Sequence, residues 1–297
     1  MSRVAEELDE LNTPGRSNGL LDVFRWRFLL SLLVRKELRV RYRGSVLGLF
    51  WSYVKPGMQL LVFYVAMGKF LRLDEAVPNF VIYLFSGIVI VNFFSEVFNN
   101  TTRSIVWNGD LVKKIYMPRE LFPVASLWVA VVHLLPQLVV LMIAAFFGGW
   151  RPGPLNILAG LLALLITMAS GLGLGLLFGG LNVLFRDSEN FVELILMMAT
   201  WLSPVLYQWS KVRDALPPWL WTIYQLNPGT TAVQLAHYAF WVPAEPVQQY
   251  YAANPDPGPV APSLMMWTVI ALVSSSLIMV VGQFTFRRLE GRFAQEL

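Results

Sequence analysis

The sequence predicts an all-α integral membrane protein with six transmembrane helices. Of its 297 residues, 56% are hydrophobic and only 14% are charged, whereas about a quarter of the residues of a soluble globular chain are charged. Several apolar runs are about 20 residues long, which is the length a helix needs to cross the hydrocarbon core of a bilayer. A soluble fold of this length would expose too much apolar surface. The predicted spans are 46–69, 79–100, 121–147, 155–181, 190–208 and 263–286.

The distribution of lysine and arginine predicts the orientation of these spans. The cations concentrate before the first span, between the second and third, and after the last. Cytoplasmic segments carry the excess of Lys and Arg, so these segments are predicted to be cytoplasmic. Both termini are therefore predicted to be cytoplasmic, in agreement with an even number of spans. The acidic start of the chain lacks the basic stretch and apolar core of a cleavable signal peptide. The opposite loops carry only Lys69, Arg72, Arg151, Lys211 and Arg213.

A basic amphipathic stretch, from about Phe24 to Arg43, precedes the first span. On a helix its apolar residues share one face and its cations another, so the helix should lie in the headgroup plane with its cations near lipid phosphates. Two interpretations remain open: an entrance for an anionic lipid headgroup, or an anchor that only fixes topology. The cations assigned to such an entrance are Arg35, Lys36, Arg39, Arg41 and Arg43.

Two polar connections also suggest local structure. The loop from Thr101 to Pro118 reads as a short cytoplasmic helix with apolar and basic faces. Such a helix can dock into a groove on a partner, although a plain basic connector would look the same. The outer segment from Gln208 to Pro262 begins with an aromatic-rich part that fits short re-entrant helices, which need shielding by protein or water. Its later part, Pro243 to Pro262, is rich in proline and predicts an irregular loop.

Several chemistries find no support in the sequence. The chain has no cysteine and two histidines far apart in sequence, so no metal site and no catalytic residue are assigned. No G-x-x-x-x-G-K-[ST] motif is present, so ATP binding through a P-loop is not expected. Gly171, Gly175 and Gly179 lie inside an apolar span at four-residue spacing, which is typical of close helix packing rather than of a nucleotide loop. The basic pI is explained by membrane orientation, and no nucleic-acid partner is predicted.

Three ionisable residues, Lys55, Glu96 and Glu193, lie within or close to predicted spans. Charges inside a bilayer are costly and usually face a bundle interior or a water-filled path. They could therefore line a pore. Alternatively, Glu96 and Glu193 could lie near span ends and contact headgroup water. Both interpretations stay open at this point.

Several motifs, in order from about residue 24 to the C-terminus, resemble the membrane subunits of ABC-2-type polysaccharide exporters, the family that includes O-antigen, teichoic acid and capsule transporters. Within that family the chain resembles the mycobacterial exporters of lipid-linked galactan. The resemblance rests on the stretches 47–51 with 55–56, 108–120, 185–187 with 202–205, 226–228 and 286–294. It identifies the loop from Thr101 to Pro118 as the ATPase coupling loop, with Asn108, Gly109, Asp110, Leu111, Lys113 and Lys114 as its residues.

The resemblance implies a permease of the bacterial plasma membrane that pairs with a second copy of itself and two ATP-binding ABC subunits. ATP and Mg would be bound by those subunits, and this chain would hold no cofactor. The substrate would be a glycan carried on a polyprenyl pyrophosphate, with membrane lipid around the complex. Competing classes are a secondary transporter or channel and a membrane-embedded glycosyltransferase, for which Asp187 and Glu189 are the nearest acidic candidates. Pore or glycan contacts are assigned to Lys55, Glu96, Glu193, Tyr207, Trp219 and Tyr224.

The predicted organisation has four parts. They are a polar cytoplasmic N-terminus (1–23), an amphipathic interface helix (24–45), a six-helix transmembrane domain (46–286) and a cytoplasmic tail (287–297).

Overall fold

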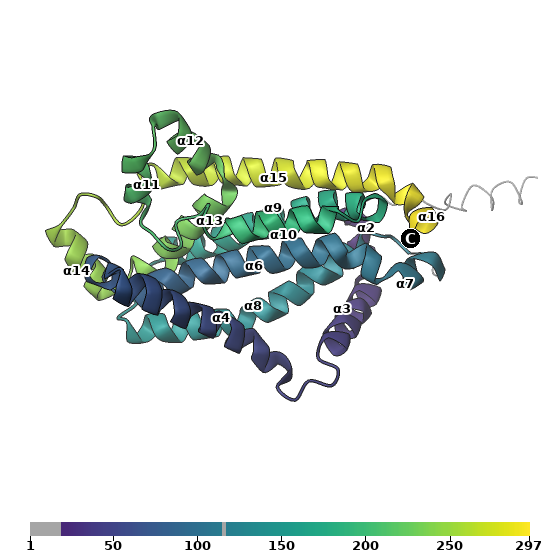
Figure 1. Cartoon of the computed structure of the whole chain (residues 1–297), viewed down its shortest axis with the longest axis horizontal. Helices are drawn as coiled ribbons and strands as arrows, with labels where there is room; N and C mark the ends of the chain where they lie inside the picture. Colours follow the sequence, from purple (N-terminus) through teal and green to yellow (C-terminus); the bar gives the residue numbers. More distant parts are fainter. Residues whose placement is uncertain (1–18, 115–116) are drawn as a thin grey trace, which may run out of the picture.

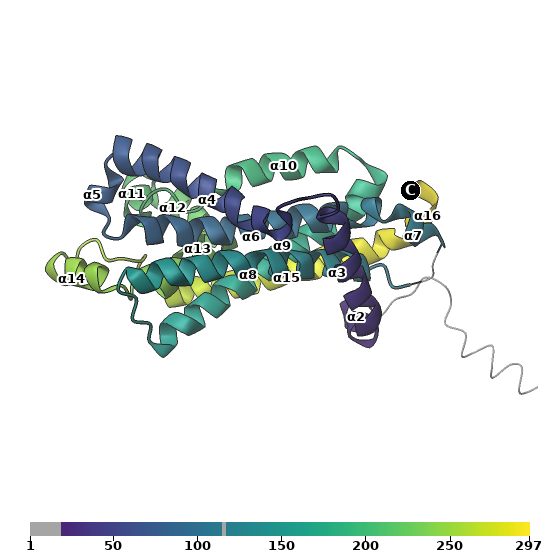
Figure 2. The same ribbon diagram turned by 90° about the horizontal axis from the view of Figure 1, so that it is seen from below.

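The computed structural model describes residues 19–114 and 117–297, and most of the predicted N-terminal part lies outside these ranges. Four helices in the described part are long and apolar enough to cross a membrane. They lie side by side as one elongated bundle, with shorter helices at both of its ends (Figures 1 and 2). These four are α6 (Phe80–Trp107), α8 (Leu121–Phe147), α9 (Pro154–Leu184) and α15 (Leu264–Leu289).

The shorter elements mark the two ends of the bundle. Helices α11, α12 and α14 gather at one end, called here the α14 end, and α7 and α16 at the other, called the α7 end (Figure 1). The elements are α2 (Leu20–Arg25), α3 (Arg27–Arg41), η1 (Gly48–Phe50), α4 (Trp51–Phe63), η2 (Tyr64–Phe70), α5 (Leu73–Ala76), α7 (Gly109–Lys114), α10 (Ser188–Ala199), α11 (Trp209–Ala215), α12 (Pro218–Leu226), α13 (Pro228–Ala236), η3 (His237–Trp241), α14 (Glu245–Ala253), η4 (Glu290–Arg292) and α16 (Phe293–Glu296).

Helix α6 is the centre of the bundle and α15 lies at its edge. In the most apolar window of each helix, 72% of α6 is buried inside the protein but only 17% of α15. Helices α8, α9, α10, α13 and α4 all contact α6. Since α15 exposes most of its apolar surface, it fits a helix that faces lipid on one side and α9 on the other (Figure 1).

Helix α9 packs closely on α6 through the predicted glycine face, which the structure confirms. A Cβ atom at Gly171 would lie 2.9 Å from the Val97 side chain, and one at Gly175 would lie 2.5 Å from Thr101. Small residues at such positions allow two helix backbones to approach within van der Waals contact. In a bilayer this contact replaces the hydrophobic driving force between helices.

A second glycine face of α9 meets α15, and sequence analysis did not identify it. A Cβ atom at Gly282 would lie 2.0 Å from the carbonyl oxygen of Gly173, and one at Gly173 would lie 2.6 Å from the Met279 backbone. The two helices therefore touch through their main chains. Because α9 is held in this way on both sides, α6, α9 and α15 form the most closely approaching part of the bundle.

The second predicted span is longer than expected. The sequence places its end at residue 100, whereas α6 continues to Trp107. A helix of 28 residues is about 42 Å long, more than the roughly 30 Å hydrocarbon core. The first half of the predicted Thr101–Pro118 loop is thus a continuation of α6, and the separate short helix is α7.

The fifth predicted span, 190–208, is not one continuous helix. Helix α10 ends at Ala199, and turns follow up to Tyr207. Pro204 lacks a backbone N–H and disfavours helical geometry at Ser203. The carbonyl groups freed by this break have side-chain partners: Tyr83 donates to the carbonyls of Pro204 and Tyr207 at 3.0 and 2.6 Å. Non-helical backbone at membrane depth requires such shielding.

The first predicted span, 46–69, consists of η1, α4 and η2 in succession, with Pro56 inside α4 and a π-helical segment from Tyr64. The predicted amphipathic helix is divided at Trp26 into α2 and α3. On α3 the predicted apolar face is turned inward, since Leu33 is buried, and α3 packs on α8.

The outer segment contains the expected short helices, α11 to α13 with η3. The proline-rich part that was predicted to be irregular instead contains helix α14. It is attached to the α8–α9 connection by a β-bridge between Trp150 and Ala244 and by an ion pair of 3.0 Å between Arg151 and Glu245.

The Gly173–Gly282 contact generates a stability prediction. Gly282→Ala places a methyl group against a main-chain oxygen, so the thermal unfolding midpoint of the purified chain should fall by several degrees. Gly57→Ala is the matched control, since a Cβ atom at Gly57 meets nothing within 4 Å and alanine favours helix. An equal midpoint for both variants would contradict the packing described here.

Candidate functional site

A polar cavity of about 690 Å³ lies between α3, α4, α6, α8 and α10. This volume falls within the usual range of ligand pockets. Three helices contribute polar residues to it at four-residue spacing, which places each set on one helix face. These are Lys55 and Gln59 on α4, Asn92, Glu96 and Asn100 on α6, and His133 and Gln137 on α8.

Arg41, the last residue of α3, projects into this cavity and is its most connected cation. Its guanidinium donates to Glu96 at 2.6 Å and to Asn100 at 3.0 Å. The Nδ1 atom of His133 lies 2.9 Å from the same Arg41 nitrogen and is in hydrogen-bond contact with Glu96. The Nε2 atom of His133 lies 2.7 Å from the Tyr42 hydroxyl. When Nδ1–H donates to Glu96 and Nε2 accepts from Tyr42, Glu96 accepts from both Arg41 and His133, and the approach of Arg41 to His133 is not itself a hydrogen bond.

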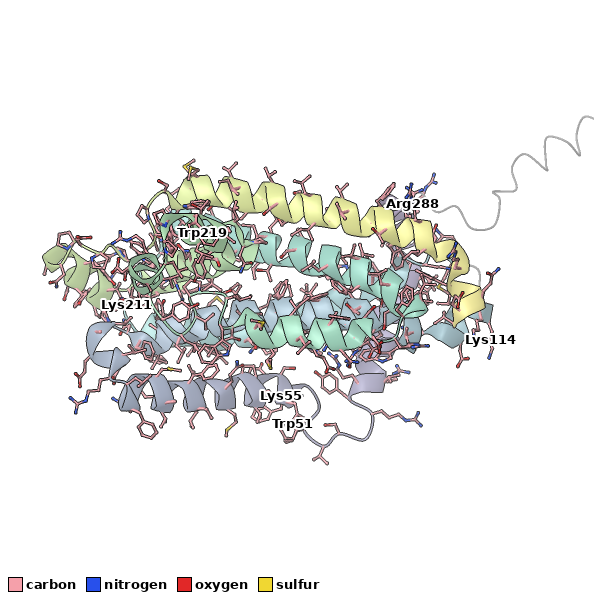
Figure 3. All side chains as sticks on the ribbon, turned by 45° about the horizontal axis from the view of Figure 1, so that its top comes forward. Trp51, Lys55, Lys114, Lys211, Trp219 and Arg288 are labelled. Atoms are coloured by element: carbon pink, nitrogen blue, oxygen red, sulfur yellow. The ribbon has the colours of Figure 1, made fainter. Side chains whose placement is uncertain are left out.

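The structure gives the position of Glu96 along α6, and its two predicted roles stay open. Glu96 lies about 16 Å along the helix axis from the α7 end of α6, well inside the helix and not at its end. It shares the cavity with Lys55, whose ammonium has no ion-pair partner among the described residues. The structure therefore brings two of the predicted pore residues together. Lys55 and Trp51 lie on α4, beside the segment that joins it to α3 (Figure 3).

The cavity reaches toward a second, smaller one of about 440 Å³ that is lined by Lys36, Glu37, Trp107 and Asn108 among others. Arg41 and Asn100 line both cavities. The Lys36 ammonium donates to the Asn108 side chain, which in turn donates to the Ser104 carbonyl at 2.8 Å. A residue predicted for the headgroup entrance thus contacts one predicted for the coupling loop.

Helix α3 is held to α8 by a second polar contact. The Ser126 hydroxyl donates to the Glu37 carboxylate at 3.3 Å. Burial raises the pKa of Glu37, and Ser126 and the neighbouring Lys36 oppose the shift. The other predicted entrance cations behave differently: Arg35, Arg39 and Arg43 are exposed and form no ion pair within the described ranges.

Helix α7 presents the predicted coupling residues unequally. Asp110, Lys113 and Lys114 are exposed, whereas Asn108 and Val112 are buried and Gly109 and Leu111 are half-buried. On its inner side α7 contacts the C-terminal helix α16. The fully buried ring of Phe293 fixes α16, packing on Phe286 at 5.2 Å between centroids and beneath the Arg119 guanidinium.

The remaining predicted contacts lie elsewhere. Glu193 on α10 pairs with Arg103 of α6 at 2.6 Å, and Arg103 also contacts Glu189 at 3.1 Å. Tyr207 and Tyr224 lie at the α14 end, where the Tyr207 hydroxyl donates to the Trp201 carbonyl. Trp219 points outward on α12 (Figure 3). These residues do not converge with Lys55 and Glu96 on one site in the described chain.

His133, Asn100 and Gln137 belong to the cavity but were not identified from the sequence. All three are at least nine-tenths buried, and the Oε1 atom of Gln137 has no hydrogen-bond partner. A usable signal was present, since polar residues recur every four positions inside otherwise apolar spans. The sequence gives no sign that these residues lie near Arg41, because they come from helices far apart along the chain.

Long apolar helices around a polar cavity, with an exposed basic helix at one end, define a membrane-embedded transport subunit. The chain belongs to the ABC-2 type transporter family, whose sequence profile matches residues 29–241. It is a multi-pass permease of this family, whose membrane subunits lack an ATPase domain, and the family implies a separate ATPase partner.

Named relatives agree with this assignment. An O-antigen export system permease protein RfbA of Klebsiella pneumoniae is 29% identical over 201 residues, 67% of this chain and 75% of the relative. The RfbA permease of Myxococcus xanthus is 29% identical over 243 residues, 78% of this chain and 89% of the relative. The polysialic acid transport protein KpsM of Escherichia coli is 20% identical over 215 residues, 71% of this chain and 80% of the relative.

The Arg103 ion pairs generate a prediction about α10. Arg103→Gln removes both carboxylate contacts that tie α10 to α6, so amide hydrogen exchange in residues 188–199 should become faster. Arg186→Gln is the control, because Arg186 is exposed and forms no ion pair in the described chain. If both variants exchange like the unsubstituted protein, these ion pairs do not hold α10.

Proposed function

We propose that this chain is the permease subunit of an ATP-driven exporter that moves polyprenyl-pyrophosphate-linked polysaccharide from the cytoplasm to the outer side of the inner membrane. The observation that carries the proposal is the polar cavity formed by α4, α6 and α8 in a member of a transporter family whose named relatives export O-antigen or transport polysialic acid. A hydroxyl-rich substrate with an anionic pyrophosphate needs a polar path of this kind. Galactan as the exported polymer stays a prediction from sequence resemblance.

The proposed orientation places the α7 end in the cytoplasm. Most cations of the described chain lie at that end, including those of α3, α7 and the end of α15, whereas the α14 end holds few. Lys114 and Arg288 lie at the first end and Lys211 at the other (Figure 3). Cytoplasmic loops carry the excess of Lys and Arg. With α4–η2 and α10 with its following turns added to the four long helices, six crossings would place both termini in the cytoplasm.

A second copy of the chain would close the pore. Lys55, Ser52 and Gln59 give one side of α4 a polar surface that cannot face lipid without large cost. The neighbouring faces of α4 and α10 expose large apolar side chains, among them Leu61, Leu194 and Met197. We therefore propose that α4 and α10 meet their counterparts across a two-fold axis and enclose the polar surface. Such an isologous contact is the commonest oligomer geometry.

Two alternative classes have less support. A glycosyltransferase would need grouped acidic residues, but Glu189 is engaged by Arg103 and by Asn182 at 2.9 Å. The described part of the chain also contains no group of three His, Asp or Glu residues able to hold a metal. A secondary transporter would move substrate without an ATPase partner, which the first experiment below tests.

Proteoliposomes that contain the chain together with its ATP-binding partner should move lipid-linked polysaccharide only when ATP and Mg are supplied. The permease alone, and the complex with a non-hydrolysable ATP analogue, should not. The measurement is protection of the glycan from an external glycosidase. Transport by the permease alone under an ion gradient would overturn the proposal in favour of a secondary transporter.

Docking of the partner on α7 is tested by single cysteines, which need no removal of native ones because the chain has no cysteine. Cysteines at Asp110, Lys113 and Lys114 should crosslink to the ATP-binding subunit, because these positions are exposed. A cysteine at the buried Val112 should not. If the three exposed positions fail to crosslink in an intact complex, α7 is not the docking helix.

A further inference from the structure

We propose that Glu96 is a resident anion that occupies the phosphate position of a diphosphate-binding site centred on Arg41, and that the diphosphate headgroup of a lipid-linked glycan displaces it. The inference rests on the proposed function for the identity of the ligand. It assigns the headgroup site to Arg41 and Lys55 inside the cavity. The exposed cations of α3, in particular Arg39 and Arg43, would then not be the direct ligands.

The geometry of the cavity favours a site for an anion with two phosphate groups. Its lining contains two cations, Arg41 and Lys55, and one carboxylate, Glu96. With Glu96 satisfied by Arg41, the Lys55 ammonium is left without an ion-pair partner among the described residues. A guanidinium can hold a phosphate with two parallel hydrogen bonds, and an ammonium adds a point charge. A diphosphate could therefore bind both Arg41 and Lys55, whereas the single carboxylate of Glu96 pairs with Arg41 alone.

The exchange of Glu96 for a phosphate is feasible because each member of the pair keeps another partner. Glu96 retains its contact with His133, and Arg41 retains Asn100. The Arg41–Glu96 pair is also open to the cavity, with 35% and 22% of the two side chains exposed. A fully buried pair would leave a desolvated charge on separation, whereas the exposure of this pair allows water to solvate the released carboxylate.

An independent observation also indicates a ligand. Gln137 is 6% exposed and lines the cavity, yet its Oε1 atom has no hydrogen-bond partner. Buried polar atoms in folded proteins are nearly always hydrogen-bonded. The Oε1 atom is enclosed, so a hydroxyl group of a first sugar next to the diphosphate would reach it only after the Gln137 side chain turns toward the cavity. The combination of cations and amide groups matches a sugar diphosphate better than a simple anion.

The site is also connected to the proposed docking helix. Arg41 and Lys36 lie on the same short helix, and Lys36 contacts Asn108, directly before α7. Release of Arg41 from Glu96 frees the end of α3 that faces the cavity. Headgroup binding would then be transmitted to α7 through α3, a helix of 15 residues.

Binding is tested with radiolabelled farnesyl diphosphate and the purified permease in lipid nanodiscs. Arg41→Gln should weaken binding about tenfold or more, and Lys55→Gln should weaken it several-fold. Glu96→Gln should tighten binding, because the competing carboxylate is removed. In the double variant Arg41→Gln with Glu96→Gln, this gain should disappear, since there is no longer a guanidinium to release. Arg27→Gln on α3 and Glu75→Gln at the α14 end are the matched charge controls.

Competing probes separate the possible sources of the phosphate. Unlabelled farnesyl diphosphate should compete best, farnesyl monophosphate more weakly, and inorganic pyrophosphate more weakly still if the lipid chain contributes. Equal competition by inorganic pyrophosphate would overturn the lipid-headgroup assignment. Thermal unfolding of each variant controls for folding, and Glu96→Asp, which shortens the carboxylate by one methylene group, provides a second way to weaken the contact with Arg41.

Three results would overturn the proposal. These are weaker binding in a folded Glu96→Gln or Glu96→Asp variant, an equal loss in Arg39→Gln or Arg43→Gln, or no probe binding by a permease whose complex exports glycan. The last result would leave the proposed function intact. Conversely, the expected binding pattern in a complex that moves no glycan with ATP would overturn the proposed function and leave a diphosphate site.

Discussion

The close main-chain contact of α9 with both α6 and α15 is the constraint on which the rest of the structure depends. Glycines on two faces of α9 bring three helix backbones into contact, and lipid offers no hydrophobic force that could substitute for this packing. Once one side of α6 is closed by α9, its polar residues can face only the other side. The stripe of Asn92, Glu96 and Asn100 therefore turns toward α3, α4 and α8, and the cavity follows from this arrangement.

Helix α3 connects the large cavity with the proposed docking helix α7. Its apolar face lies on α8, its last residue enters the large cavity, and Lys36 contacts the residue that precedes α7. A short, well-anchored helix is suited to carry a change from the cavity to a docking surface. Arg41 points into the cavity, where its guanidinium donates to Glu96.

At the α14 end, side chains shield irregular backbone. After α10 ends, the chain turns near Pro204, and its free carbonyl groups accept hydrogen bonds from Tyr83, Asn227 and Thr230. Tyr207, one of the aromatic residues assigned to glycan contact from the sequence, donates to the Trp201 carbonyl in this region. In the protein interior Tyr83 stacks on His237 and meets Trp241 edge to face, and burial accounts for the presence of these rings.

The sequence by itself determined the features that depend on local pattern. Long apolar runs gave the four principal helices to within a few residues, except at the end of α6, and the four-residue glycine spacing identified the α6-facing side of α9. The basic amphipathic stretch predicted α3, and the exposed cations of α7 lie where the coupling loop was expected. Each of these follows from helical periodicity or from the cost of charge in lipid, which act along one segment at a time.

Only the tertiary structure decided which residues meet. The fifth span is interrupted near Pro204. The interruption is stabilised by Tyr83, more than a hundred residues earlier, whose hydroxyl donates to the Pro204 carbonyl. Arg41, Glu96 and His133 come from three helices. No local pattern places them together. Their meeting is set by the side of α6 that α9 leaves open, and contacts of this kind are decided by packing geometry across the whole bundle.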